Sequence, residues 1–227
     1  MKTSNTKSRL LSLAILIFIS AFSSCKKNNV DDTGQFKLKI VNASATSSPQ
    51  SFTLAGSILV SEGLRYQDAT NYISSPSGTR LVAEFKNPNG SVYASGEIFT
   101  ANTISQTVYL IGQGSKARIK YFTDNLSTPN SGKVKIKFIH FSDNAPSNVR
   151  IKDSSGTELQ NNITRNEDTG YKFVDPGVLS IQLSSTSSGE ILGTSDVRDL
   201  QSGRIYDIYF TDDADGKLIE NKVLHDQ

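Results

Sequence analysis

The feature that most constrains this chain is an internal repeat with a spacing of about 98 residues. Residues 36–41 (FKLKIV) and 134–139 (VKIKFI) both alternate apolar and basic side chains, which is the pattern of a half-buried β-strand. Each run is followed by a polar stretch that reaches a proline, Pro49 in the first copy and Pro146 in the second. Solenoid repeats are shorter, roughly 20 to 50 residues, so this spacing predicts two tandem domains.

The correspondence continues beyond the first strand. Residues 72–78 match residues 171–177 in the spacing from a tyrosine to a glycine, and a second alternating run follows each of them. The two copies also end alike when residues 121–124 (YFTD) are set against residues 223–226 (VLHD). We therefore expect the repeat to cover almost all of the chain after its N-terminal segment.

Each copy contains about six or seven short runs of β-branched and aromatic residues, separated by turn residues. This pattern, in which no amphipathic helix of normal length is visible, predicts an all-β protein of two tandem immunoglobulin-like β-sandwich domains. We place the first domain at residues 35–125 and the second at residues 133–227. Residues 126–132 (LSTPNSG) are expected to form the linker between them.

Residues 1–24 are predicted to be a lipoprotein signal peptide. Their basic residues are Lys2, Lys7 and Arg9, and no acidic residue precedes Cys25. The apolar run of residues 10–22 suits a signal peptide and is shorter than the roughly 20 residues that cross a bilayer. It ends in residues 22–25 (FSSC), which resemble the bacterial lipobox, although Phe22 stands where that motif usually has leucine.

Cys25 is the only cysteine in the sequence, which excludes an internal disulfide and a multi-cysteine metal site. We expect it to be lipidated and to anchor the chain to a membrane. The alternatives are an ordinary secretory signal with an incidental cysteine and a transmembrane anchor. Residues 25–34 would form a flexible polar tether. Acidic tethers of this kind resemble the surface-export signals of Bacteroidetes-type lipoproteins, so we expect outer-membrane attachment and hypothesise surface exposure.

The charge of the chain argues against a nucleic-acid partner. The full sequence has 24 basic and 22 acidic residues, but three of the basic residues lie in the signal peptide. Its removal would leave 21 basic and 22 acidic residues, a net charge of −1. A nucleic-acid-binding surface needs an excess of basic residues, and we therefore expect none.

Residues 134–146 (VKIKFIHFSDNAP) resemble the opening strand of the family known as domain of unknown function 4397, with its His-x-Ser and Ala-Pro elements. The tyrosine-to-glycine stretch of each copy is the second marker of this family. The resemblance implies tandem domains in an exported bacterial protein and brings no established activity. The first copy departs from the pattern because it has Asn42 where the second copy has His140. Any function of that histidine would therefore belong to one copy only.

Two polar motifs have both a structural and a chemical interpretation. His140 could titrate or bind a metal, but we favour a structural role in fixing the turn at residues 142–146, because sequence adjacency to a serine and an aspartate does not make a catalytic triad. Residues 211–216 (TDDADG) resemble part of a calcium loop, yet Lys222 stands where that loop needs glutamate. We predict a hairpin turn there and no metal site.

The eight tyrosines of the chain could line a carbohydrate-binding face, but those in expected strands are better explained as core residues. Tyr66 and Tyr93 lie near expected loops and are our candidate ligand-binding residues. No residue is predicted to be catalytic, and no cofactor is expected.

Three functions are compatible with these features. We favour a non-enzymatic cell-envelope lipoprotein that acts as a binding or adhesion module for a glycan or a protein, since two similar domains on a tether could bind a repetitive ligand with avidity. The alternative is a structural or assembly subunit of an outer-membrane complex, which would pair through exposed strand edges. The third is an enzyme with carboxylates from separate loops, and nothing in the sequence supports it.

Overall fold

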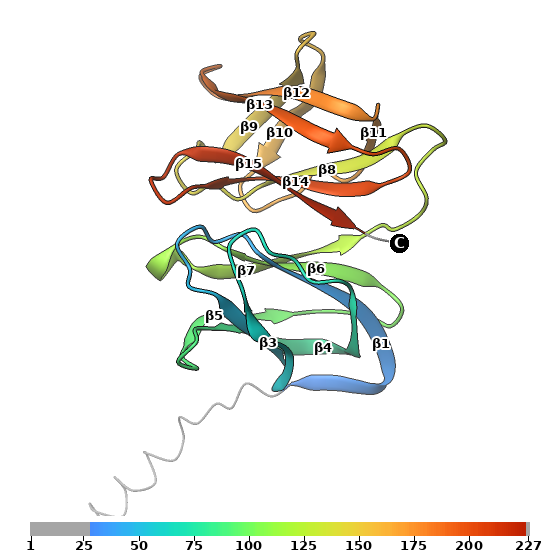
Figure 1. Ribbon diagram of the computed structural model, residues 1–227, viewed down its shortest axis with the longest axis vertical. Coiled ribbons are helices and arrows are strands. Elements are labelled where there is room, and N and C mark those ends of the chain that lie inside the picture. Colours follow the sequence, from blue (N-terminus) through green and yellow to red (C-terminus); the bar gives the residue numbers. More distant parts are fainter. Residues whose placement is uncertain (1–27, 226–227) are drawn as a thin grey trace, which may run out of the picture.

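The computed structural model describes residues 28–225, and Figure 1 shows them as two β-rich halves stacked along the long axis. The first half contains β1 (Asn29–Asn42), β2 (Gln50–Leu54), β3 (Ser57–Leu64), β4 (Ile73–Lys86), β5 (Val92–Ile98), β6 (Ser105–Ile111) and β7 (Arg118–Asp124). The second half contains β8 (Val134–His140), β9 (Asn148–Asp153), β10 (Glu158–Thr164), β11 (Lys172–Val174), β12 (Gly177–Ser185), β13 (Ile191–Leu200), β14 (Ile205–Asp212) and β15 (Leu218–His225). Within this range the one helical element is the 3-10 turn η1 (Gly114–Lys116), which confirms the all-β prediction, and no helix there is long and apolar enough to cross a membrane.

Each half consists of two facing sheets. In the first half β4 belongs to both sheets, because residues 73–80 pair with β1 while residues 81–86 pair with β2 and β5. The orders are therefore β4-β1-β6-β7 and β3-β2-β4-β5. In the second half two separate strands, β11 and β12, take the place of β4. The orders β11-β8-β14-β15 and β10-β9-β12-β13 then repeat those of the first half.

The parallel strand pairs define equivalent positions in the two halves. β1 runs parallel to β6, with Lys39 opposite Thr107. β8 runs parallel to β14 in the same way, with Lys137 opposite Asp207. Lys39 is therefore equivalent to Lys137, and Thr107 to Asp207.

The last strand of each half corrects our alignment of the two copies. Asp124 pairs with Ser105, and His225 pairs with Ile205, which is the residue equivalent to Ser105. Asp124 is thus equivalent to His225, whereas the sequence comparison set it against Asp226. The difference of one residue matters because successive side chains of a strand point to opposite faces of the sheet.

A hydrophobic core fills the space between the two sheets of each half. In the first half, members from four strands are Leu38, Phe52, Ala83 and Val108. Buried members from the corresponding strands of the second half are Ile136, Ile151, Ile181 and Ile208. Because both sheets contribute to each core, the arrangement in each half is sandwich-like.

A third apolar core joins the two halves. Its buried members are Val41, Ala43, Tyr109, Ile111, Ile139, Phe141, Tyr209 and Val223. The ring centroids of Tyr109 and Tyr209 lie 5.7 Å apart at its centre. The prediction that the alternating runs are half-buried is correct for Lys37, which is exposed, but wrong for the other lysines, since Lys39 is 3 % exposed and Lys137 is 0 % exposed. The face that carries these lysines packs against the other half.

The predicted flexible tether extends too far into the chain. We placed it at residues 25–34, but β1 begins at Asn29, and its first residues pair with residues 77–80 of β4. The Asn28 Oδ1 atom also accepts a hydrogen bond of 2.8 Å from the backbone N–H of Val82. Backbone pairing, which a polar composition does not reveal, therefore holds residues 29–31 in the sheet, and pairing resumes at Gln35 after an irregularity.

Candidate functional site

A cluster of charged side chains is buried where the two halves meet. The Lys137 ammonium lies 3.2 Å from Asp124 Oδ1 and 3.4 Å from Asp207 Oδ2. It also lies 3.7 Å from Asp168 Oδ2, whose side chain is partly exposed. His225 Nε2 lies 3.0 Å from Asp207 Oδ1. The side chains of Lys137, Asp124, Asp207 and His225 are all 0 % exposed, so the centre of the cluster is closed to solvent.

Hydroxyl groups of the first half complete this network. Tyr72 Oη donates a hydrogen bond of 2.8 Å to Asp124 Oδ2 and lies 2.7 Å from His225 Nδ1. Tyr109 Oη donates a hydrogen bond of 2.5 Å to Asp207 Oδ2. The contacts of Tyr72 with His225 and of Tyr109 with Asp207 cross from one half to the other, so the network links them directly.

The single hydroxyl proton of Tyr72 decides the direction of its two contacts. Because Tyr72 Oη donates to Asp124, it accepts from His225 if the Nδ1 atom of that ring carries a proton. The contact between His225 Nε2 and Asp207 Oδ1 is an ion-pair distance without hydrogen-bond geometry. The Lys137 ammonium is therefore the cation that faces both buried carboxylates.

The pKa values in the cluster reflect burial and the neighbouring charges. Burial and the Asp207 carboxylate raise the pKa of Asp124. Burial also opposes ionisation of Asp207, but the Lys137 ammonium and His225 hold the pKa of Asp207 below its usual range. For Lys137, burial favours loss of the proton, and the facing carboxylates nevertheless raise its pKa. Lys137 and Asp207 therefore keep each other ionised in the interior.

The burial of this cluster and its central ammonium limit what it can bind. Asp124, Asp207 and His225 offer ligand atoms within 4.8 Å of one another, a spacing that a metal ion could use. The Lys137 ammonium lies among these atoms, however, and its charge would repel a cation. Because the side chains are closed to solvent, what the network can do is fix how the two halves are oriented.

The sequence did not reveal this cluster. The alternation of residues 134–139 predicts a strand whose lysines face solvent, and nothing in the sequence around His225 indicates that it is buried. The structure instead buries His225 completely, in β15. The available signal was Asp207, a carboxylate in the middle of the otherwise apolar residues 205–210.

His140 has a structural position that agrees with the role we favoured. Its Nε2 atom lies 2.8 Å from the carbonyl oxygen of Pro146, which fixes the turn after β8. Burial lowers the pKa of His140, so the neutral ring is favoured there. In the first half, Asn42 donates a hydrogen bond of 3.0 Å to the carbonyl oxygen of Leu64. The Asn42 amide at the end of β1 and the His140 imidazole at the end of β8 thus each contact a backbone carbonyl oxygen.

The two candidate tyrosines are half-buried, and each hydroxyl has a partner within the protein. Tyr93 is the second residue of β5, packs against the first core, and accepts a hydrogen bond of 3.2 Å from the Gly114 N–H. Tyr66 lies in a turn and accepts a hydrogen bond of 3.4 Å from Asn221 Nδ2. Neither lines the groove described below, and their use as ligand contacts stays a prediction.

Residues 211–216 form part of the hairpin between β14 and β15, as predicted. Gly216 has a φ of 80° and donates a backbone hydrogen bond of 3.0 Å to Asp213. The Asp212 carboxylate accepts a hydrogen bond of 2.5 Å from the Ser142 hydroxyl. The acidic side chains of this segment therefore stabilise turns.

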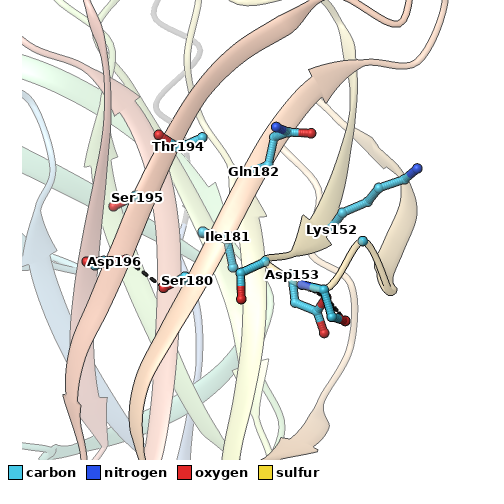
Figure 2. A pocket seen from close by; sticks show the side chains of 11 residues that line it. Lys152, Asp153, Ser180, Ile181, Gln182, Thr194, Ser195 and Asp196 are labelled. Atoms are coloured by element: carbon cyan, nitrogen blue, oxygen red, sulfur yellow. Dashed lines mark hydrogen bonds between the residues drawn. The ribbon is translucent and has the colours of Figure 1, made fainter.

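An open groove lies on the outer face of the second half, over β9, β12 and β13 (Figure 2). Its volume is about 730 Å³. Gln182 on β12 is opposite Lys152 on β9 and Thr194 on β13, so these three side chains form a row across the sheet. In the neighbouring row Ser180 donates a hydrogen bond of 2.6 Å to Asp196. The groove therefore presents polar side chains that a ligand could reach from solvent.

Solved structures offer only distant likenesses. A protein from Bacteroides uniformis ATCC 8492, described as a candidate cell adhesion protein, is 9 % identical with a TM-score of 0.29, over 86 % of this chain and 99 % of that one. A family 41 carbohydrate-binding module from streptococcal virulence factors, from a study of α-glucan recognition, is 12 % identical with a TM-score of 0.26, over 82 % and 97 %. The fimbrial anchor protein Mfa2 from Porphyromonas gingivalis is 9 % identical with a TM-score of 0.21, over 85 % and 100 %. Likeness at this level carries no functional argument, and no curated protein matches the sequence.

A family model matches residues 36–152, just over half of the chain. The match covers the first half from β1 onward and continues through β8 into β9 of the second half. It confirms the family suggested by residues 134–146, while a second copy in the second half stays a prediction. The chain belongs to the family described as domain of unknown function (DUF4397).

Proposed function

We propose that this chain is a lipid-anchored protein of the bacterial cell envelope that binds a glycan or protein ligand without converting it chemically. Its two halves would be tandem immunoglobulin-like domains of the same family. The observation that carries the proposal is the open polar groove over β9, β12 and β13. By contrast, the most strongly perturbed ionisable groups are buried between the halves, where they would serve structure and not catalysis.

The position of the proposed anchor supports a role in presenting this groove. Cys25 lies outside the described residues, four residues before the start of β1 at Asn29. At about 3.5 Å per extended residue, a lipid on Cys25 would hold the first half within about 14 Å of the membrane surface. Figure 1 shows the start of β1 at the end of the first half that lies away from the second half. The second half would then project outward.

Contacts between the halves support a rigid arm. The Arg118 guanidinium on β7 makes two hydrogen bonds to the Asp143 carboxylate, at 2.9 and 3.0 Å. Gln113 Nε2 donates a hydrogen bond of 2.8 Å to the carbonyl oxygen of Asp213. Together with the third core and the buried cluster, these contacts would keep the groove at a fixed distance from the anchor.

A structural or assembly subunit is the second candidate, and one edge strand favours it. β13 is the last strand of its sheet and pairs with β12 on one side only. Ile191 at its start is 60 % exposed. A free edge with an exposed apolar residue can accept a strand from a partner.

Membrane attachment is tested by the variant Cys25→Ser. In the native bacterium, the parent chain should incorporate labelled palmitate and sediment with membranes, whereas the variant should do neither. Lys26→Ala, at the adjacent position, serves as the control and should behave like the parent chain. Labelling of the Cys25→Ser variant would contradict the lipid anchor.

Ligand binding is tested with a soluble protein of residues 26–227. The protein is screened against envelope and host glycans and is used to capture partners from an outer-membrane extract. Saturable binding without turnover supports the binding module. A stoichiometric partner that is lost with Ile191→Lys, which adds a charge to the β13 edge, supports the assembly subunit instead. Turnover of a bound compound would refute both.

A further inference from the structure

The row formed by Lys152, Gln182 and Thr194 has hydrogen-bonding capacity that the protein itself does not use. Within residues 28–225 none of these three side chains has a hydrogen-bond or ion-pair partner. Lys152 and Gln182 are partly exposed and Thr194 is exposed. Figure 2 shows them side by side on the three strands that form the groove. The Lys152 ammonium can donate hydrogen bonds, and the Gln182 amide and the Thr194 hydroxyl can each donate and accept them.

The equivalent row of the first half is closed by internal contacts. There β2, β4 and β5 place Thr53, Glu84 and Ser95 side by side. Thr53 Oγ1 donates a hydrogen bond of 3.2 Å to Glu84 Oε2, and the Lys86 ammonium lies 2.9 Å from the same oxygen. One oxygen of the Glu84 carboxylate at the centre of that row thus already has two partners within the protein. The fold is the same in both halves, but only the second half leaves the centre of the row available.

The charges around the groove select the class of ligand. Lys152 contributes one positive charge and Asp153 one negative charge, while the Asp196 carboxylate is paired with the Arg198 guanidinium at 2.9 Å, so these charges cancel. Hydrogen bonds from the side chain and backbone of Ser155 lower the pKa of Asp153, which keeps it ionised. A groove whose charges cancel offers a polyanion no net electrostatic attraction. A neutral ligand whose groups both donate and accept hydrogen bonds meets the row without a charge penalty.

We propose that this row binds an uncharged polysaccharide chain. The inference rests on the proposed binding function and names its ligand class. Sugar hydroxyls donate and accept, as the Gln182 amide and the Thr194 hydroxyl require. Neighbouring strands are about 4.8 Å apart, so the row spans about 10 Å of an open face and can take a segment of a longer chain.

The composition of the groove also sets the strength of this interaction. The residues that line it include no aromatic ring on which a sugar could stack. Binding therefore depends on hydrogen bonds that compete with water, and each site is weak. Many anchored copies on one membrane would raise the overall affinity for a polymer.

The test uses the soluble protein of residues 26–227 in affinity gels that contain dextran, mannan or arabinoxylan, with alginate and heparin as polyanions. One of the neutral polymers should retard the parent protein. The double variant Gln182→Ala/Thr194→Ala should bind that polymer about tenfold more weakly, because it lacks two hydrogen-bonding side chains. The matched control is Glu84→Ala/Ser95→Ala in the first half, which should bind like the parent protein. Thermal unfolding of each variant checks that it is folded.

Retardation by a neutral polymer that is lost in the second-half variant and kept in the first-half control supports the inference. Equal retardation of the two variants, stronger retardation by alginate or heparin, or no retardation by any polymer would overturn it. The proposed function is judged separately. If the polymers fail but a protein ligand binds saturably to residues 26–227, the binding function stands and the polysaccharide inference falls.

Discussion

Replacing Lys137 with methionine should destabilise the protein strongly. The Lys137 ammonium is the buried cation that faces both Asp124 and Asp207, at 3.2 and 3.4 Å. Methionine has a similar length and fills the same apolar space, so packing changes little. The variant would leave the two buried carboxylates without the ammonium that faces them both.

The magnitude follows from the cost of leaving a buried charge unpaired. Removal of one partner from a buried ion pair costs about 3–5 kcal/mol. Asp168 is partly exposed and can turn to solvent, so its loss of a partner adds little. We therefore expect Lys137→Met to lower the free energy of unfolding by about 3–5 kcal/mol at pH 7.

Urea unfolding, followed by tyrosine fluorescence and circular dichroism, measures this difference. Lys37→Met is the matched control, because Lys37 lies on β1 and is exposed. The control should change the free energy of unfolding by less than about 0.5 kcal/mol. A loss below about 1 kcal/mol in Lys137→Met would refute the view that the ammonium balances the two carboxylates.

The pH dependence of the variant provides a second check. The pKa of Asp124 is already raised by burial and by Asp207, so Asp124 is the carboxylate that can take up a proton when Lys137 is absent. Protonation removes one of the two unpaired charges. The destabilisation should therefore be smaller at pH 5 than at pH 8. A penalty that does not change with pH would count against this explanation.

Three further predictions concern other parts of the molecule. The pKa of Asp207 is held below its usual value of 3.8, so the stability that Asp207 contributes is present above about pH 4 and is lost as the pH falls through its folded value. Asp207→Asn should therefore lower the midpoint of urea unfolding at pH 7. The same variant should show a smaller decline in melting temperature below pH 4. Gly78→Ala would place a Cβ atom 2.2 Å from the Asn29 carbonyl oxygen, so it should cost about 1–3 kcal/mol and speed amide exchange at the start of β1. Tyr93→Phe leaves the Gly114 N–H without its acceptor and should cost about 0.5–1.5 kcal/mol in urea unfolding while ligand binding stays unchanged. Loss of binding in that variant would restore Tyr93 as a ligand contact.

Local patterns were sufficient to predict several of the strands. Alternation in residues 36–41 and 134–139 identifies β1 and β8, because side chains of a strand point to opposite faces in turn. The hairpin at residues 211–216 could also be predicted, since a glycine with positive φ suits a tight turn. These features depend on neighbouring residues, so a single sequence contains them.

The interface between the halves could not be predicted in this way. A strand that alternates apolar residues with lysine looks the same whether its second face meets water or another sheet. The structure shows the second case, since Lys137 and Lys135 are almost completely buried. The groove has a similar limitation. Its row of side chains comes from three strands, with Lys152 on β9, Gln182 on β12 and Thr194 on β13. Their spacing in the sequence does not predict the sheet order that brings them together.

The two halves use the same face to meet each other, and the charges on that face differ at equivalent positions. Thr107 and Asp124 in the first half correspond to Asp207 and His225 in the second. In the native interface, Lys137 of the second half contacts Asp124 of the first, and Tyr109 of the first half donates to Asp207 of the second. If two second halves packed together, Lys137 would lose its Asp124 partner. If two first halves packed together, Tyr109 would lose its Asp207 partner. Leaving such buried groups unpaired costs free energy, so divergence of the repeat favours the pairing of unlike halves within one chain over the pairing of like halves between chains.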